Sequence, residues 1–336
     1  MSEPVNQASS PLMSEPVLLR TKADLAAARP GLPAPVVLVP TMGALHHGHR
    51  ALLRAARAAA GPSGRVIVSI FVNPLQFRPG EDLDRYPRTL DDDLAMCAQE
   101  GVRAVFAPSA AEIYPGGPPQ VTVDPGPAGQ VFEGEFRPGF FGGVLTVVLK
   151  LFHLVRPDVA VFGEKDAQQL ALVRRLVADT NLGVTIEAVP TVRDPDGLAT
   201  SSRNRYLSAA DREVALTLPR ALRAGQARVV AEAGPEAAAE ASPEAAAEAG
   251  PEAAAGNANR AAAALAAARE VLCGEPALAV DYVAVVDPRT FGPPGPGPAL
   301  IVAAVTVAGT RLIDNVPVAL TGGRNTERDF RGAAHH

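Results

Sequence analysis

The sequence predicts an α/β protein in which a doubly wound, Rossmann-like parallel sheet precedes a second, smaller α+β domain. Two patterns and the chain length indicate this class. From residue 36 to residue 178, short β-branched runs alternate with stretches of helical periodicity. Beyond residue 191, two helical stretches are followed by several strand-like runs. The chain has 336 residues, 47% of them hydrophobic, which is enough for one large core or two smaller ones.

Four runs in the first part are predicted to be buried parallel strands: residues 36–39, 66–71, 104–106 and 159–162. Helical periodicity lies between and after them, at residues 50–60, 90–101, 144–155 and 167–180. Alternation of this kind implies right-handed crossovers, and such sheets bind ligands beyond the carboxyl ends of their strands. We therefore expect the chemistry directly after the first, second and fourth strands.

The predicted first domain spans residues 18–191 and ends with a further strand at 184–189. The predicted second domain spans residues 192–324, with helices at 209–228 and 260–272 and strands at 280–286, 300–307 and 310–312. Residues 1–17 contain Met-Ser-Glu-Pro-Val twice in a Ser/Pro-rich setting, which predicts a disordered tail. Residues 325–336 are a second predicted tail.

An eight-residue repeat of the type Gly/Ser-Pro-Glu-Ala-Ala-Ala-Glu-Ala lies within residues 232–256. Its copies begin at Gly234, Ser242 and Gly250. Each proline restarts any helix, and alanine alone buries little apolar surface. The repeat is therefore predicted to be a solvated, partly helical insertion without a catalytic role.

Composition excludes several classes of function. The net charge of −5 supplies no basic excess for a phosphate backbone, so we expect small-molecule substrates and no nucleic acid. The two cysteines, Cys97 and Cys273, lack the spacing of a zinc site or disulfide framework. No uninterrupted apolar stretch approaches the roughly 18 residues of a membrane span, and the N-terminus does not resemble a signal peptide. These features predict a cytoplasmic protein without a membrane partner.

A histidine motif follows the first predicted strand. His46 and His49 are separated by Gly48 at the start of a predicted helix, where backbone N–H groups and the helix dipole favour anions. Two imidazoles there are suited to donate hydrogen bonds to a phosphate chain as negative charge develops. The alternative is a solvent-facing histidine cluster.

The second and fourth strands are also followed by polar residues. Gln76 after the second strand is suited to hold a hydroxyl or carboxylate, or else to stabilise its own loop. The run Asp91-Asp92-Asp93 is suited to Mg²⁺, or else to the dipole of the helix that it begins. After the fourth strand, Gly163 allows close approach of a ligand, Lys165 offers a charge to a phosphate, and Asp166 can accept from ribose hydroxyls.

A loop further along the chain carries Ser201, Ser202 and Arg203, two hydroxyls and a guanidinium that suit a triphosphate. The fingerprints of the P-loop and of dinucleotide-binding folds are missing from the sequence, as is a Gly-x-Ser-x-Gly elbow for a serine nucleophile. The residues therefore point to nucleotide chemistry without a protein nucleophile, which works by positioning and electrostatics.

Five motifs, in this order, resemble the pantothenate synthetase (pantoate–β-alanine ligase) family. They are Pro40-Thr41-Met42-Gly43-Ala44-Leu45-His46-x-Gly48-His49, Phe71-Val72-Asn73-Pro74-x-Gln76-Phe77, Arg137-Pro138-Gly139, Phe162-Gly163-Glu164-Lys165-Asp166-x-Gln168-Gln169 and Ser201-Ser202-Arg203-Asn204-x-Tyr206-Leu207. The first motif is also similar to that of the nucleotidyltransferases and class I aminoacyl-tRNA synthetases. The resemblance covers residues 37–207 and continues more weakly to about residue 316.

The resemblance implies an activity and a set of site residues. The implied activity is ATP-dependent condensation of (R)-pantoate with β-alanine through a pantoyl adenylate, with release of AMP and pyrophosphate. The implied catalytic residues are His46, His49, Lys165, Ser201, Ser202 and Arg203. The implied ATP site contains these six together with Met42, Gly43, Ala44, Leu45, His47, Gly48, Gly163, Glu164, Asp166, Val192 and Thr200.

The substrate-binding residues are expected to be Gln76, Gln169, Asn73, Tyr86 and Arg137, and the Mg²⁺ ligands Asp92 and Asp93. The resemblance also implies a homodimer, and we expect the second domain to act as a lid that keeps water from the adenylate. The chain departs from the family at Phe140, Ala167, Thr200 and Met96, which leaves the complete metal site and the finer packing open. A nucleotidyltransferase and a non-catalytic nucleotide-binding regulator are the two alternatives.

Overall fold

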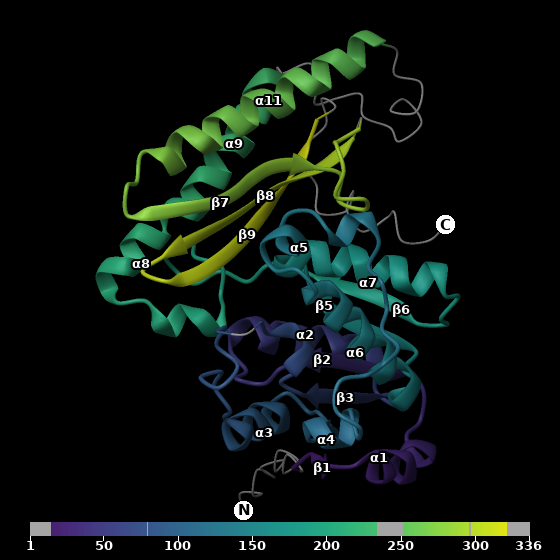
Figure 1. The fold of residues 1–336 in the computed structure, drawn as a ribbon. Helices are drawn as coiled ribbons and strands as arrows, with labels where there is room; N and C mark the ends of the chain where they lie inside the picture. The colour runs from purple at the N-terminus through teal and green to yellow at the C-terminus, as the bar shows by residue number, and fades with distance from the viewer. Residues whose placement is uncertain (1–14, 79, 234–250, 296, 321–336) are drawn as a thin grey trace, which may run out of the picture.

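The computed structural model describes residues 15–78, 80–233, 251–295 and 297–320. It confirms the predicted fold class: a six-stranded parallel sheet with helices, followed by a separate domain built on a three-stranded antiparallel sheet. The two sheets lie in different halves of the molecule, the parallel one in the lower half of Figure 1 and the antiparallel one in the upper half.

The parallel sheet has the strand order β1-β4-β3-β2-β5-β6. Its strands are β1 (Val17–Leu19), β2 (Val36–Thr41), β3 (Arg65–Ile70), β4 (Ala104–Phe106), β5 (Val159–Gly163) and β6 (Thr185–Val189). From β2 the chain proceeds outward through β3 to β4, then returns to the other side of β2 as β5. The switch point of a doubly wound sheet, where ligands bind, therefore lies between the carboxyl ends of β2 and β5.

Helices cover both faces of this sheet. Alternate residues of β2 point to opposite faces, so Val36 and Leu38 join one hydrophobic core while Val37 and Val39 join another. The first core is closed mainly by α1 (Lys22–Ala28), α6 (Phe140–Val155) and α7 (Ala167–Asp179). The second is closed by α2 (His47–Ala60) and α3 (Leu90–Gln99). Two short helices, α4 (Ala110–Ile113) and α5 (Glu133–Phe136), complete this half.

The second domain packs two long helices on an antiparallel sheet of order β7-β8-β9. Its elements are α8 (Ala209–Ala215), α9 (Thr217–Ala233), α11 (Pro251–Cys273), β7 (Leu278–Val286), β8 (Pro298–Val307) and β9 (Thr310–Ala319). Ile301 and Val305 of β8 face these helices, whereas Leu300 and Val302 contact the first domain. Both faces of the small sheet are thus covered.

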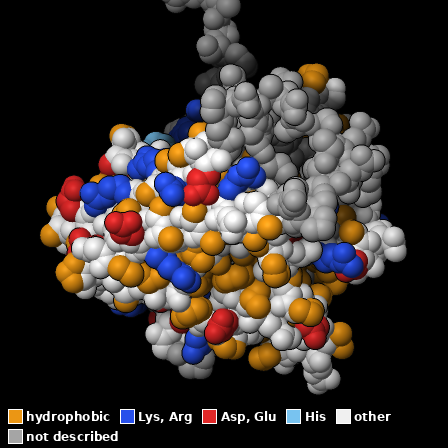
Figure 2. Space-filling view, turned by 90° about the horizontal axis from the view of Figure 1, so that it is seen from above, with side chains coloured by type: hydrophobic (Ala, Val, Ile, Leu, Met, Phe, Trp, Pro, Cys, Tyr) orange, Lys and Arg blue, Asp and Glu red, His pale blue; other side chains and the backbone are white. Residues whose placement is uncertain are grey.

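Small residues let α9 and α11 approach closely. A Cβ atom at Gly225 of α9 would lie only 2.9 Å from the carbonyl oxygen of Ala264 in α11. Ala261, Ala264 and Ala268 are buried in this contact region. On the outer face of this half, hydrophobic side chains are interspersed with charged ones (Figure 2). The alanine content of the helices thus provides the close packing of the second domain.

Several element boundaries differ from those predicted. Val17, assigned to the N-terminal tail, begins β1 because its N–H donates to the Arg103 carbonyl beside β4. The predicted helix 209–228 is divided at Leu216 into α8 and α9, and β9 runs seven residues beyond the predicted 310–312. Within 232–256, the described residues at both ends belong to α9 and α11, and the others lie outside the described residues, as does 325–336.

Over the described ranges, no helix is long and apolar enough to cross a membrane.

Candidate active site

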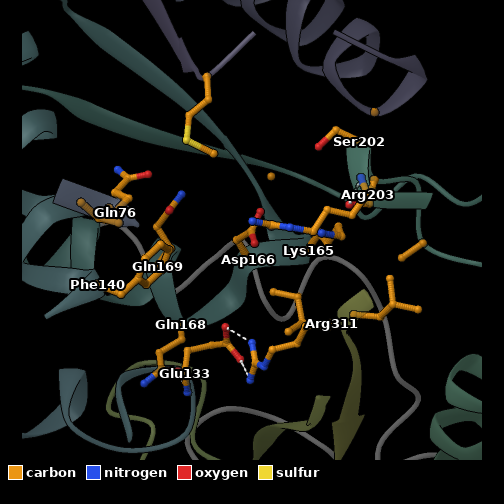
Figure 3. A pocket seen from close by; sticks show the side chains of 18 of the residues that line it. Gln76, Glu133, Phe140, Lys165, Asp166, Gln168, Gln169, Ser202, Arg203 and Arg311 are labelled. Carbon is orange, nitrogen blue, oxygen red and sulfur yellow. Dashed lines mark hydrogen bonds and ion pairs between the residues drawn. The ribbon is translucent and has the colours of Figure 1, made fainter. Parts of the chain in front are cut away.

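A cavity of about 870 Å³ opens between the two halves of the molecule, at the switch point of the parallel sheet. Many of the predicted site residues line it: Met42, His46, Gly48, His49, Gln76, Tyr86, Arg137, Gly163, Lys165, Asp166, Gln169, Val192, Thr200, Ser201, Ser202 and Arg203. The others do not line it: Gly43, Ala44, Leu45, His47, Asn73, Asp92, Asp93 and Glu164. In Figure 3, Gln76 and Gln169 lie at one end, Ser202 and Arg203 at the other, and Lys165 with Asp166 between them.

The two motif histidines are fixed by the backbone at the start of α2. The Gly48 N–H donates to His46 Nδ1 at 3.1 Å, and the His46 N–H donates to His49 Nδ1 at 3.2 Å. Together these bonds form a capping box in which imidazoles replace the usual hydroxyl and carboxylate. Because Nδ1 accepts in both rings, a neutral ring carries its proton on Nε2. Each ring then has one Nε2–H donor left for a ligand.

Gly48 is required by the position of the His46 ring. A Cβ atom at residue 48 would lie 2.9 Å from Cε1 and 3.1 Å from Nδ1 of His46. The two rings themselves stack at a tilt, with centroids 4.1 Å apart. The glycine between the histidines therefore allows the first ring to fold over the start of the helix.

Both imidazoles are held neutral. Burial, the positive charge of Lys165 and, to a smaller extent, that of Arg205 lower the pKa of His46 to about 4. Burial, His46 and Lys165 lower the pKa of His49 to about 3. The rings are therefore uncharged hydrogen-bond donors at neutral pH.

Asp93 anchors the loop that precedes the histidines. Its carboxylate accepts the N–H groups of Ala44 and Leu45 at 3.0 and 2.8 Å and the Thr89 hydroxyl at 3.2 Å. Gly43 and Ala44 both have positive φ, and a Cβ at Gly43 would come within 2.9 Å of Asp93 Oδ2. The backbone therefore curls around this buried carboxylate.

Asp92 and Asp93, the predicted magnesium ligands, have different surroundings. Asp93 is 2% exposed and its oxygens are engaged by the backbone, while Asp92 is exposed and outside the cavity wall. The described residues contain no group of three or more His, Cys, Asp or Glu side chains arranged to hold a metal ion. Asp93 is thus already engaged by the loop, and a magnesium role for Asp92 and Asp93 stays a prediction.

Lys165 lies in a short 3-10 turn, Glu164–Asp166, between β5 and α7. In the part of the chain that the structure describes, its ammonium makes no hydrogen bond or ion pair, and it lines the cavity. Its charge acts on both imidazoles. An unpaired cation thus faces the same space as two neutral donors.

Gln76 and Asn73 lie in the loop after β3 but have different surroundings. Gln76 lines the cavity, at the end of the 3-10 turn Pro74–Gln76. Asn73 is 1% exposed, accepts from the Leu75 N–H and the Tyr114 hydroxyl, and donates to the Gly143 carbonyl at 3.1 Å. Asn73 thus fixes the loop against α6, and its expected contact with substrate stays a prediction.

Two ion pairs tie the segment after Gln76 across the cavity. Arg137 pairs with Glu81 at 2.7 Å, donates to the Gln76 carbonyl at 2.8 Å and lies 3.9 Å above the Phe140 ring. Arg203 pairs with Asp82 at 3.2 Å. The two arginines therefore hold neighbouring carboxylates of one segment.

The chain matches the family model described as pantoate-beta-alanine ligase over residues 18–317. It is 55% identical to the pantothenate synthetase of Acidothermus cellulolyticus, over 91% of this chain and 92% of that protein. It is 53% identical to that of Thermobifida fusca, over 94% of this chain and all of that protein. The chain belongs to the pantoate–β-alanine ligase family.

Solved structures of this ligase family share the fold. The pantothenate synthetase of Thermus thermophilus superposes with a TM-score of 0.76 at 43% identity, covering 90% of this chain and 99% of that one. The ligase of Francisella tularensis, described as complexed with β,γ-ATP and β-alanine, gives a TM-score of 0.67 at 30% identity, covering 90% and 97%.

Two of the residues that depart from the ligase family's pattern have defined contacts. Phe140, where the family commonly has histidine, supports the Arg137 guanidinium through its ring face. Thr200, where the family commonly has methionine, donates its hydroxyl to Asp194 at 2.7 Å. Both side chains fix neighbouring groups of the cavity wall.

Sequence analysis missed the part of the cavity wall that comes from β9 and from the residues around it. Glu133, Tyr282, Arg311, Asp314 and Asn315 all line the cavity. The one available signal was the polar pair Asp314-Asn315, which interrupts an apolar run in a strand. Glu133 accepts both NH groups of Arg311, at 2.7 and 2.6 Å (Figure 3). It also accepts the Tyr282 hydroxyl at 2.9 Å.

Proposed function

We propose that this cavity carries out the reaction of the family: the ATP-dependent condensation of (R)-pantoate with β-alanine to pantothenate. The observation that carries the proposal is the convergence of two neutral Nε2–H donors and the unpaired Lys165 ammonium at the switch point of the sheet. Such a group stabilises charge that develops on phosphate oxygens and provides no nucleophile.

In the first half-reaction, an oxygen of the pantoate carboxylate attacks the α-phosphorus of ATP and pyrophosphate leaves. Negative charge then increases on the departing phosphates. We assign its stabilisation to His46, His49 and Lys165, and assign Ser201 and Ser202 to the phosphate oxygens. Gln76 and Gln169 are assigned to pantoate, whose hydroxyls and carboxylate suit uncharged amides.

Arg203 and Arg137 have a different part in this proposal. Each already pairs with a carboxylate of the segment that contains Glu81 and Asp82. A phosphate or substrate carboxylate therefore competes with an existing ion pair for either guanidinium. We assign both arginines to orienting this segment, with Tyr86, around the bound substrates.

In the second half-reaction, the amine of β-alanine attacks the acyl carbon of the pantoyl adenylate, and AMP leaves. The adenylate must be kept from water, and β9 of the second domain already forms a wall of the cavity. We therefore propose that residues 192–324 act as the lid of a first domain that comprises residues 18–191.

The resemblance of the motifs also supports proposals about the setting of the reaction. We propose that the chain works in the cytoplasm as a homodimer, which light scattering of the purified protein would test. We propose that magnesium enters with ATP on the phosphate oxygens, since the Asp93 carboxylate already accepts two backbone N–H groups.

The test measures the half-reactions separately. ATP–pyrophosphate exchange that depends on pantoate reports adenylate formation, and reaction of supplied pantoyl adenylate with β-alanine reports the second step. Alanine at His46 or His49 should slow exchange by about a hundredfold to a thousandfold. The second step should change much less, because the pyrophosphate has already left.

Alanine at His153, an exposed histidine of α6 outside the cavity, is the control and should leave both steps intact. Formation of ADP in place of AMP would exclude the adenylate route. An equal loss in both steps would show that the histidines shape the whole pocket and do not act on the leaving group.

A further inference from the structure

Asn315 of β9 joins the second domain to the turn that carries Lys165. Its side-chain amide donates to the carbonyls of Glu164 and of Lys165, both at 2.9 Å. Asn315 is 8% exposed and lines the cavity. One planar amide therefore satisfies two successive carbonyls of the 3-10 turn at the end of β5.

The position of Asn315 is itself fixed. The adjacent Asp314 receives both terminal nitrogens of Arg193, at 2.6 and 3.0 Å, and its carboxylate also accepts the Asn315 N–H at 2.8 Å. The same guanidinium donates to the Asn315 carbonyl at 3.3 Å. Arg193 lies just beyond the predicted boundary between the domains. The amide is thus held by a bidentate ion pair at the point where the chain passes from one domain to the other.

The two hydrogen bonds act on the backbone of the turn and leave the Lys165 ammonium free. Two successive carbonyls held by one rigid donor fix the plane of the Lys165 peptide group, and with it the direction in which the side chain leaves the backbone. The bonds exist only while β9 is docked on the first domain. The place of the Lys165 charge is therefore tied to the closed arrangement of the two halves.

We infer that Asn315 is a positioning residue: it aligns Lys165 for adenylate formation and makes that alignment depend on docking of the second domain. This inference rests on the proposed role of Lys165 in the first half-reaction. It adds that the second domain contributes to catalysis through the backbone of the Lys165 turn, in addition to closing the cavity.

The test uses Asn315→Ala and Asn315→Asp in the full chain. Aspartate has the shape of asparagine but no N–H donor, and its charge would face two carbonyl oxygens. Both variants should lower the kcat of pantoate-dependent ATP–pyrophosphate exchange by about tenfold to a hundredfold, as small misplacements of reacting groups do. The KM for pantoate and the reaction of supplied pantoyl adenylate with β-alanine should change little.

Gln226→Ala provides the matched control. Gln226 of α9 also donates a side-chain amide N–H to a carbonyl of β9, that of Pro317, at 2.8 Å, but it does not contact the Lys165 turn. Its loss should lower thermal stability to a similar degree as the loss of Asn315 and leave exchange intact. If Gln226→Ala slowed exchange as much as Asn315→Ala, the effect would be general loosening of the domain, and the inference would be overturned.

A double-mutant cycle with Lys165→Ala distinguishes the positioning role of Asn315 from the proposed role of Lys165 in adenylate formation. If Asn315 acts through Lys165, Asn315→Ala should slow exchange by less than about twofold in the Lys165→Ala background. Fully additive losses would overturn the inference while leaving the proposed function standing. If Lys165→Ala alone left exchange unchanged, the proposed role of Lys165 would fail first, and the positioning role with it.

Discussion

In the proposed reaction, two imidazoles can act as hydrogen-bond donors because each has its other nitrogen occupied by the backbone. His46 Nδ1 and His49 Nδ1 both accept N–H groups of the loop and helix start, so the ligand meets only Nε2. A neutral donor adds no charge in the ground state, and its hydrogen bond strengthens as charge moves onto the leaving group. Lys165 supplies the full positive charge next to them, and burial together with that charge lowers the pKa of both rings so that they stay neutral.

The lowered pKa values predict how stability depends on pH. The folded protein holds His46 and His49 at pKa values of about 4 and about 3, below the ordinary value of about 6.5 in the unfolded chain. As pH falls below that ordinary value, the two histidines bind protons in the unfolded chain but stay neutral in the folded one. The free energy of unfolding therefore decreases. At pH 5 each histidine should lower the free energy of unfolding by up to about 2 kcal/mol relative to pH 8.

Chemical denaturation at pH 8 and pH 5 measures this loss. The double variant His46→Gln, His49→Gln should lose much less stability than the parent between the two pH values. His153→Gln should behave as the parent does, because that side chain is exposed. A parent and double variant with the same pH dependence would contradict the neutral assignment of the two rings.

At the scale of elements, the site depends on how β2 and β5 end next to each other. β2 leads into the histidine loop and α2, and β5 leads into the Lys165 turn and α7. The sequence was sufficient to predict this arrangement, since alternating strands and helices place all carboxyl ends at one edge. The residues that end or follow strands of this sheet and line the cavity include Met42, His46, His49, Gln76, Gly163 and Lys165.

Elements that form only by pairing with distant parts of the chain could not be predicted from the local sequence. β1 has only three residues, Val17–Leu19, and exists because β4 offers it a parallel edge. In β9, Asp314, Asn315 and Pro317 interrupt the apolar pattern, although pairing with β8 continues past all of them. The structural use of Asp93 and Asn73 likewise follows from loops that approach them from far along the chain.

The second prediction concerns the start of α2, where Gly48→Ala should place a methyl group 2.9 Å from Cε1 of His46. The His46 ring must then move, because the backbone at the start of a helix is rigid. We expect ATP–pyrophosphate exchange to fall by about tenfold or more, since a displaced donor no longer meets the charge. Thermal stability should change little in comparison.

Gly31→Ala is the matched control for that substitution, as no atom lies within 4 Å of a Cβ at this exposed position. It should leave exchange intact. Normal exchange in a folded Gly48→Ala protein would show that the motif glycine does not serve to seat the histidine.

At the scale of the whole molecule, the cavity is closed by bonds between groups that are remote in sequence. Glu133 and Arg311 are 178 residues apart, and Asn315 and Glu164 are 151 residues apart. No local pattern predicts such pairs, because they arise only when the two sheets dock. Sequence analysis therefore found the part of the cavity wall that follows β2, β3 and β5 and the loop 200–203, and missed the wall that β9 and Glu133 provide.

The repeat is predicted to take no part in the contacts between the two domains that close the cavity. Replacing residues 234–250 by a short Gly-Ser linker that joins α9 to α11 should leave the overall ligase rate within about twofold, because long surface insertions add little to stability. The rate and the melting temperature of the variant, compared with those of the parent, check this. A large fall in rate would mean that the segment contacts the site or a partner subunit.

The last prediction concerns the ion pair that links the two domains beside the cavity. The Glu133 side chain is 8% exposed and holds Arg311 and the Tyr282 hydroxyl, while Arg311 also holds Asp281 at 2.6 Å. Removing one partner of a buried pair strands the other, at a cost of up to about 3–5 kcal/mol. The two single substitutions should differ, because their stranded partners differ.

Glu133→Gln leaves Arg311 with Asp281, whereas Arg311→Met leaves the buried Glu133 carboxylate with only Tyr282 among the partners seen here. We therefore expect Arg311→Met to lower the free energy of unfolding more than Glu133→Gln does. The double variant no longer strands the Glu133 carboxylate, although Asp281 still loses Arg311, so it should be more stable than the sum of the two losses implies. Denaturant titration of all four proteins measures the coupling, and strictly additive losses would show that Glu133 and Arg311 do not hold the domains together as a pair.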